Sequence, residues 1–201
     1  MNPPAADGTT TFAMVGTGWM AAAIAPDFAS CGFARLTTVV SRSRDRADAF
    51  ATKFGVTATA TIEELPALDV DVVYIATPHH NHAELACAAL EAGKHVLLEK
   101  AFTMDAAEAR HVAQTALAHD RFLMEAMWMR FNPAIRRAHE LLLAGSIGEP
   151  RTLQASFGRA VPYDRSHRLW DPARGGGSVL DQGVYPITLA DLVFGPPATV
   201  A

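Results

Sequence analysis

The stretch Thr10-Thr11-Phe12-Ala13-Met14-Val15-Gly16-Thr17-Gly18-Trp19-Met20-Ala21 decides the fold. Its apolar run, residues 12–15, is typical of a buried parallel strand, and an alanine-rich segment that favours helix follows the two glycines. Gly16 allows a tight turn, and Gly18 lets the backbone approach a pyrophosphate that the N–H groups at the helix start bind. This order predicts a dinucleotide site; the alternative is a βα turn that binds nothing.

Composition excludes several classes of protein. The chain has 201 residues, 50% hydrophobic and 19% charged, which is enough for one complete domain and part of another. Its formal net charge of -4 provides no basic surface for nucleic acid, and no apolar run approaches membrane-spanning length. Cys31 and Cys87 have no metal-binding spacing, which fits a reducing cytoplasm. We therefore predict a cytoplasmic protein without a nucleic-acid or membrane partner.

The end of the second predicted strand, residues 36–40, indicates which dinucleotide is favoured. An acidic residue there would bond the ribose 2′-hydroxyl of NAD, whereas arginine accommodates the 2′-phosphate of NADP. This chain has Ser41 and Arg42 at that position, so NADP is favoured over NAD. The alternative is that Arg42, Arg44 and Arg46 form a solvated helix start.

Cap signals set several helix limits. Ser43 is expected to cap a helix over residues 44–54 that Gly55 ends, and Thr61 with Glu64 forms a capping box for a short helix. Asn81 is expected to cap a helix that runs to residue 92. Further helices are expected over residues 20–28, 105–119 and 133–144, and strands over residues 70–75, 95–98, 122–128 and 153–157.

The loop 76–82, Ala-Thr-Pro-His-His-Asn-His, follows a predicted strand. Its three histidines suggest a metal, but they lack the i, i+4 spacing of helical ligand sets, and no cysteine or carboxylate lies beside them. We predict no metal site. A loop at the carboxyl end of a strand, beside the cofactor crevice, is the favoured interpretation.

Lys100 follows the strand over residues 95–98 and points into the crevice where the nicotinamide would lie, so its cation can polarise a substrate oxygen. The alternative is a surface ion pair with Glu99.

Asp181 and Tyr185, four residues apart in a predicted helix, share a face. Tyr185 can exchange a proton with a substrate hydroxyl, with Asp181 orienting the pair, although spacing alone equally suits a core tyrosine. Pro186 weakens this helix.

Five motifs occur in order along the chain. They are Gly16-Thr17-Gly18-Trp19-Met20-Ala21, Ala76-Thr77-Pro78 with Asn81-His82, Glu99-Lys100, the run 124–131 (Met-Glu-Ala-Met-Trp-Met-Arg-Phe), and the glycine-rich run 175–186 that contains Leu180, Asp181 and Tyr185. Together they resemble the glucose–fructose oxidoreductase, inositol dehydrogenase and MocA family. Within it, the dihydrodiol and D-xylose dehydrogenases are the most similar branch, because many other relatives have histidine where Tyr185 stands.

The resemblance implies an α/β protein: a Rossmann doubly wound parallel sheet over residues 10–131, then an incomplete α/β second domain over residues 132–201. The composition of residues 1–9, rich in proline and alanine, predicts a disordered tail before them. It implies an NADP-dependent oxidoreductase that moves a hydride between nicotinamide and a sugar or diol carbon, and a homo-oligomer when full-length. The implied catalytic residues are Lys100, Tyr185 and Asp181. The implied cofactor-binding residues are Gly16, Gly18, Trp19, Met20, Ser41, Arg42, Thr77, Pro78, Asn81, His82, Glu99, Lys100, Trp128 and Arg130.

Two departures from the family pattern bear on activity. Ala101 replaces the usual proline after Glu99-Lys100, and a cis peptide bond before alanine costs about 2.5–4 kcal/mol. Relatives also continue well beyond residue 201, so the chain is expected to be C-terminally truncated, to bind NADPH, to self-associate and to turn over no sugar. The alternative function is therefore a catalytically incompetent dinucleotide-binding module. A lyase or glycosidase acting through bound NAD is disfavoured, because such relatives carry different site residues.

Overall fold

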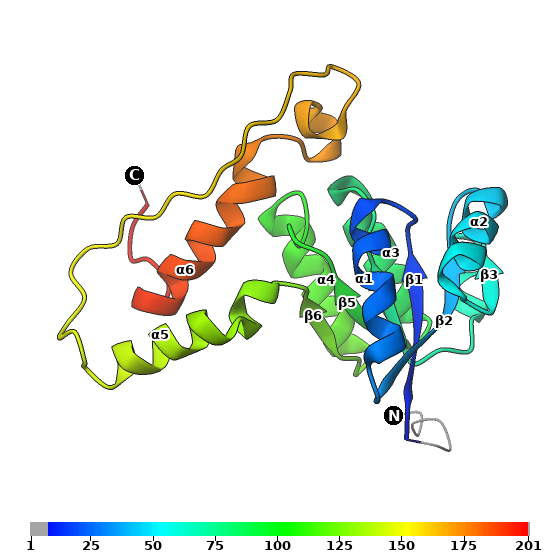
Figure 1. The fold of residues 1–201 in the computed structure, drawn as a ribbon, viewed down its shortest axis with the longest axis horizontal. Helices are drawn as coiled ribbons and strands as arrows, with labels where there is room; N and C mark the ends of the chain where they lie inside the picture. The colour runs from blue at the N-terminus through cyan, green and yellow to red at the C-terminus, as the bar shows by residue number, and fades with distance from the viewer. Residues whose placement is uncertain (1–7, 201) are drawn as a thin grey trace. The chain divides into compact units, whose positions relative to one another are not determined.

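The computed structural model describes residues 8–200, so the disordered tail predicted for residues 1–9 lies almost entirely outside the described residues. The chain divides into two compact units between Ala126 and Met127. The first contains a six-stranded parallel sheet in the order β3-β2-β1-β4-β5-β6 (Figure 1), which confirms the predicted Rossmann fold. Its strands are β1 (Thr10–Val15), β2 (Ala34–Val40), β3 (Ala58–Ala60), β4 (Val72–Ile75), β5 (His95–Leu98) and β6 (Leu123–Glu125).

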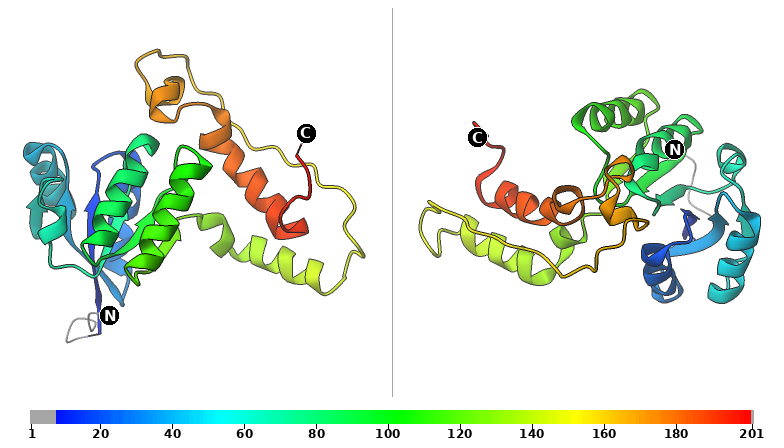
Figure 2. Two further views of the ribbon diagram at one scale, coloured as in Figure 1. Left: turned by 180° about the vertical axis from the view of Figure 1, so that it is seen from behind. Right: turned by 90° about the horizontal axis from the view of Figure 1, so that it is seen from above.

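Helices cover both faces of this sheet. They are α1 (Trp19–Ser30), α2 (Arg44–Phe54), α3 (His82–Glu91) and α4 (Ala106–Ala118). Met14 and Val39 face α1 and α2, whereas Val15 and Val96 belong to the core cluster that includes α3 and α4. The right-hand view of Figure 2 shows the blue and cyan helices on one side of the strands and the green helices on the other. Burial from both sides explains why the strands read as continuous apolar runs.

Local capping sets the ends of α2 and α4. Ser43 accepts a hydrogen bond from the N–H of Arg46, and Gly55 closes α2 in the left-handed region, with φ of 70°. Asp105 accepts hydrogen bonds from two N–H groups in the first turn of α4. The caps predicted at Ser43 and Gly55 are confirmed.

Several predicted elements differ in the structure. Asn81 makes no side-chain cap, because a 3₁₀ turn (His79–Asn81) already gives its backbone helical angles. Glu64 accepts the N–H of Thr61 as the capping box predicts, but the turn that follows is 3₁₀ (Leu65–Ala67), since Pro66 leaves little room for a longer helix. The strand predicted over residues 122–128 is shorter, and its last residues enter a 3₁₀ turn (Trp128–Phe131).

The second unit holds α5 (Pro133–Leu143) and α6 (Val184–Phe194). Its buried apolar side chains are Met127, Met129 and Tyr185, which pack with partly buried apolar side chains of both helices. The strand predicted over residues 153–157 is wrong: this stretch has no regular structure. A strand forms only against a partner strand, and none lies beside it among the described residues.

Asp181 lies in a π-helical turn (Val179–Gly183) that leads directly into α6, whereas the sequence predicts one helix, weakened by Pro186, over both Asp181 and Tyr185. Pro186 has no N–H for the carbonyl oxygen of Gln182, so the α-helical hydrogen bonds cannot run unbroken through this point. Asp181 and Tyr185 are nevertheless both buried, 5% and 9% exposed.

The peptide bond between Lys100 and Ala101 is cis.

Candidate functional site

The carboxyl ends of four strands finish level at one edge of the sheet. Val15 of β1 is in register with Val40 of β2 and with Ile75 of β4. Ile75 is in turn in register with Leu98 of β5. The loops after these strands therefore begin side by side, at the edge where doubly wound sheets bind ligands. They carry the predicted residues Gly16, Gly18, Ser41, Arg42, Thr77, Pro78, Glu99 and Lys100.

The two glycines of the first loop have different surroundings. Gly16 has φ of 109°, and a Cβ there would lie 2.6 Å from the carbonyl oxygen of Ala76, so packing itself requires glycine. Gly18 has an ordinary φ of -82°, and a Cβ there would meet no protein atom within 4 Å. Protein packing therefore gives no reason for glycine at position 18. Its missing side chain leaves open space at the start of α1.

The groups around this space fit the phosphates of a dinucleotide. The N-cap residue of α1, Gly18, makes no side-chain cap, and the first turn contains no acidic residue, so the N–H groups there suit an anion. The Thr77 hydroxyl is buried and has no hydrogen-bond partner among the described residues. A Cβ at Gly16 would lie 3.5 Å from the methyl of Thr77, which places that side chain beside the same turn. A buried hydroxyl of this kind indicates a partner that is not protein.

At the end of β2, Ser41 is buried and Arg42 is exposed. Ser41 Oγ accepts a hydrogen bond of 3.3 Å from the N–H of Ser43, which fixes the loop between the strand and α2. Arg42 makes no hydrogen bond or ion pair with any residue in the range 8–200. This exposed guanidinium suits the 2′-phosphate of NADP.

Glu99 and Lys100 follow β5. Glu99 is buried; the Tyr74 hydroxyl donates to it over 2.6 Å, and the Lys100 N–H over 3.2 Å. Burial raises the pKa of Glu99, and it also raises the pKa of Tyr74, with a smaller contribution from the Glu99 carboxylate. Lys100 is half-buried. The buried Tyr74–Glu99 pair therefore anchors the residue that precedes the predicted catalytic lysine.

His82, predicted as a cofactor residue, is fully buried. Its Nδ1 lies 2.9 Å from the carbonyl oxygen of Ala101 and 3.2 Å from that of Phe102. Its Nε2 lies 3.0 Å from the carbonyl oxygen of Thr77. The ring therefore lies between the loop after β4 and the loop that carries Lys100.

Burial lowers the pKa of His82 from 6.5 to about 4. Between these values the unfolded chain binds a proton that the folded chain does not, so stability falls as the pH drops through this window. We expect wild type to lose about 2 kcal/mol more than His82→Gln between pH 7 and 4.5, measured by urea denaturation. His80→Gln is the matched control, because His80 is exposed. This variant should lose as much free energy of unfolding between pH 7 and 4.5 as wild type does. Equal acid sensitivity of His82→Gln and wild type would contradict this account.

In the second unit, Tyr185 has aromatic neighbours. Trp128 Nε1–H donates to the Tyr185 hydroxyl oxygen over 3.1 Å. The ring of Phe157 lies 4.7 Å from the ring of Tyr185, centroid to centroid. Because an indole N–H only donates, the phenol oxygen is the acceptor in this bond, and the phenolic proton is not used in it.

Asp181 is buried, and its polar partners include Gln182 and Arg168. Gln182 Nε2 donates to it over 2.7 Å, and Arg168 Nη2 lies 3.5 Å from its other oxygen. Arg168 Nη1 is buried without a hydrogen-bond partner among the described residues. The sequence does not point to Arg168 or Phe157 as site residues, because both precede the Asp181 motif by many residues and Phe157 is only the end of a predicted strand.

The other predicted residues are more exposed. Trp19 begins α1 and is 76% exposed, Met20 and Pro78 are partly exposed, and Arg130 pairs with Asp191 over 2.8 Å at the surface. Lys100 belongs to the first unit, whereas Tyr185 and Asp181 belong to the second.

Within residues 8–200, no three histidine, cysteine, aspartate or glutamate side chains are grouped to hold a metal ion. No helix in the same range has the length and apolar character needed to cross a membrane.

Two family models match the chain. Residues 10–127 match the model described as an oxidoreductase family with an NAD-binding Rossmann fold, and residues 135–201 match the GFO/IDH/MocA C-terminal domain. The first match alone covers more than half of the chain.

Several relatives are named as dehydrogenases or reductases. D-xylose 1-dehydrogenase (NADP(+)) of Hypocrea jecorina is 47% identical over 128 residues, 60% of this chain and 33% of that protein. Trans-1,2-dihydrobenzene-1,2-diol dehydrogenase of Mus musculus is 39% identical over 80% of this chain and 48% of that protein. The 3-ketoreductase KijD10 of Actinomadura kijaniata, solved in complex with NADP and TDP-benzene, is 34% identical with a TM-score of 0.84 over 93% of this chain and 58% of that one. The chain thus spans a third to a half of the length of these curated relatives.

Proposed function

The chain belongs to the GFO/IDH/MocA oxidoreductase family, and from this premise we propose that it binds NADP(H) and serves hydride transfer between nicotinamide and a sugar or diol carbon. The observation that carries the proposal is the turn between β1 and α1. Gly16 is required by packing, but Gly18 is not, and the space beside it adjoins a helix start without a side-chain cap. That arrangement suits a pyrophosphate.

NADP is the proposed cofactor, and both a residue of this chain and the named relatives support it. The exposed Arg42 stands where a carboxylate would select NAD, and the relatives include a dehydrogenase named for NADP(+) and a ketoreductase solved with NADP. Thr77 would hold the cofactor through its buried hydroxyl, and Ser41 would support the loop that carries Arg42.

When bound, nicotinamide supplies or accepts the hydride. In our proposal Tyr185 gives or takes the proton at the substrate oxygen, and the Lys100 ammonium polarises the same oxygen. Trp128 holds the Tyr185 oxygen in place over 3.1 Å, which limits the directions the phenolic proton can take. Asp181 supports this arrangement through its contacts with Gln182 and Arg168. The D-xylose and dihydrodiol dehydrogenases among the relatives support a sugar or diol as the substrate class.

Cofactor selectivity provides the direct test. We expect the wild-type chain to bind NADPH more tightly than NADH, and Arg42→Ala to weaken NADPH binding roughly tenfold with NADH unchanged, because a charge-assisted bond to the 2′-phosphate is lost. Cofactor fluorescence gives both Kd values. Arg110→Ala, which removes an exposed arginine from α4, is the matched control. Tighter binding of NADH by wild type would overturn the assignment of NADP.

Compartment and assembly are parts of the same proposal. Cys31 and Cys87 are both free, which supports a reducing compartment such as the cytoplasm. A homo-oligomer of the full-length protein stays a prediction from the family resemblance, and light scattering measures it.

A further inference from the structure

Three arginines follow β2, and their surroundings differ. Arg42 and Arg46 are exposed, and within residues 8–200 neither guanidinium forms an ion pair or hydrogen bond. Arg44, the first residue of α2, is held by two contacts. The three cations are therefore not equivalent toward an anion at this end of the sheet.

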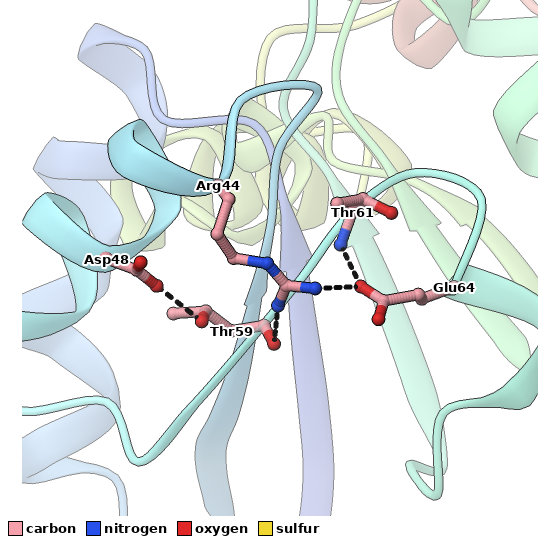
Figure 3. A network of polar contacts seen from close by, with 5 residues as sticks. All are labelled: Arg44, Asp48, Thr59, Thr61 and Glu64. Atoms are coloured by element: carbon pink, nitrogen blue, oxygen red, sulfur yellow. Dashed lines mark hydrogen bonds and ion pairs between the residues drawn. The ribbon is translucent and has the colours of Figure 1, made fainter.

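Arg44 is turned toward β3 and the loop after it (Figure 3). Its Nη1 donates to the carbonyl oxygen of Thr59 over 2.6 Å, and its Nη2 donates to Glu64 Oε2, also over 2.6 Å. Thr59 is fixed in turn, because its hydroxyl donates to Asp48 Oδ1 on α2 over 2.6 Å. The guanidinium thus bridges the first turn of α2, the edge strand and the loop after it.

Glu64 is ionised in this arrangement. The N–H of Thr61 donates to the same oxygen, Glu64 Oε2, over 2.6 Å. This backbone bond, followed by the Arg44 cation, lowers the pKa of Glu64. A carboxylate in contact with a guanidinium cancels most of its field at a distance, so a phosphate nearby experiences little of the Arg44 charge.

We propose that Glu64 limits the preference for NADPH: it holds Arg44 against β3 and keeps that cation from the 2′-phosphate, which leaves Arg42 as the principal cationic ligand. The inference rests on the proposed function, because it assumes that NADP binds at the end of β2. Arg44 lies two residues beyond Arg42, so a released Arg44 side chain remains beside the same loop. Glu64 therefore keeps the preference for NADPH below the value that all available arginines would give.

Glu64→Gln is the decisive variant. Glutamine can keep the bond to the Thr61 N–H, since capping boxes accept either residue, but it removes the charge that holds Arg44. We expect the Kd for NADPH to fall about threefold or more and the Kd for NADH to stay within error, measured by cofactor fluorescence. The unchanged Kd for NADH also reports an intact fold. Glu63→Gln is the matched control, because it removes the same charge one residue away and Glu63 is not bonded to Arg44.

The route through Arg44 is tested by a double-mutant cycle. Arg44→Ala alone should leave the NADPH-to-NADH preference close to that of wild type, and adding Glu64→Gln to it should produce no further gain. An equal gain in the Arg44→Ala background would mean that Glu64 acts through its own charge, and would overturn the inference. An Arg44→Ala variant that loses as much NADPH affinity as Arg42→Ala would also overturn the inference.

The failure of this inference can be told from that of the proposed function. A wild-type chain that binds neither cofactor, or prefers NADH, would overturn both. A wild-type preference for NADPH that Glu64→Gln does not increase would overturn the inference alone.

Discussion

Tyr185→Phe is expected to lower turnover of a sugar or diol substrate by roughly 10²–10⁴-fold in the full-length protein, with NADPH binding nearly unchanged. The substitution removes only the hydroxyl, which accepts the Trp128 N–H over 3.1 Å, and it keeps the ring that packs in the core of the second unit. Steady-state kinetics should show the loss in kcat, because a proton is transferred in the transition state. Tyr163→Phe is the matched control, since Tyr163 is 73% exposed.

Lys100→Met should produce a loss of similar size if the two side chains act on the same substrate oxygen. The double variant should then lose little more than either single variant, because residues that act as a unit are not additive. Turnover close to wild type in Tyr185→Phe would move the proton donor elsewhere, and His167, which is exposed and accepts the N–H of Leu169, would be the next residue to replace.

Gly16→Ala is expected to lower the stability of the fold, whereas Gly18→Ala is expected to weaken NADPH binding. A Cβ at Gly16 would lie 2.6 Å from the carbonyl oxygen of Ala76, on a backbone with φ of 109°, so we expect a loss of roughly 2 kcal/mol or more in the free energy of unfolding. A Cβ at Gly18 meets no protein atom within 4 Å, so Gly18→Ala should stay within about 1 kcal/mol of wild type. Its methyl group would instead occupy the pyrophosphate space and weaken NADPH binding at least about tenfold.

Urea denaturation and cofactor fluorescence measure the two quantities on the same samples. The comparison is informative because each glycine variant serves as the control for the other. Wild-type NADPH affinity in a folded Gly18→Ala variant would show that the cofactor does not approach α1 as proposed.

The features that the sequence predicts well depend on neighbouring residues. Ser43 and Gly55 delimit α2 because cap geometry is decided within one turn of the chain. The strand over residues 95–98 is found as β5 with the predicted bounds, since a short apolar run between Gly93 and a charged pair leaves little choice. The order of strand, glycine turn and helix likewise predicts the Rossmann fold.

The features that it misses depend on distant partners. Residues 153–157 have the composition of a strand, but their hydrogen bonds would have to go to another segment that five residues do not specify. Glu64 illustrates both cases in one side chain. Its bond to the Thr61 N–H follows from the capping-box spacing, whereas its bond to Arg44 joins residues 20 apart and has no local signal. Arg168 beside Asp181 is missed for the same reason.

The two outer strands of the sheet, β3 and β6, contain three residues each. An edge strand that short presents only a few unpaired backbone groups, so it is a poor template for adding a strand from another molecule. Aggregation of the Rossmann unit by edge-to-edge β-pairing is therefore disfavoured at both sides of the sheet. If samples of this chain form larger particles at high concentration, we expect side-chain contacts to hold them together, so that the particles neither bind amyloid dyes nor gain β-structure as they grow.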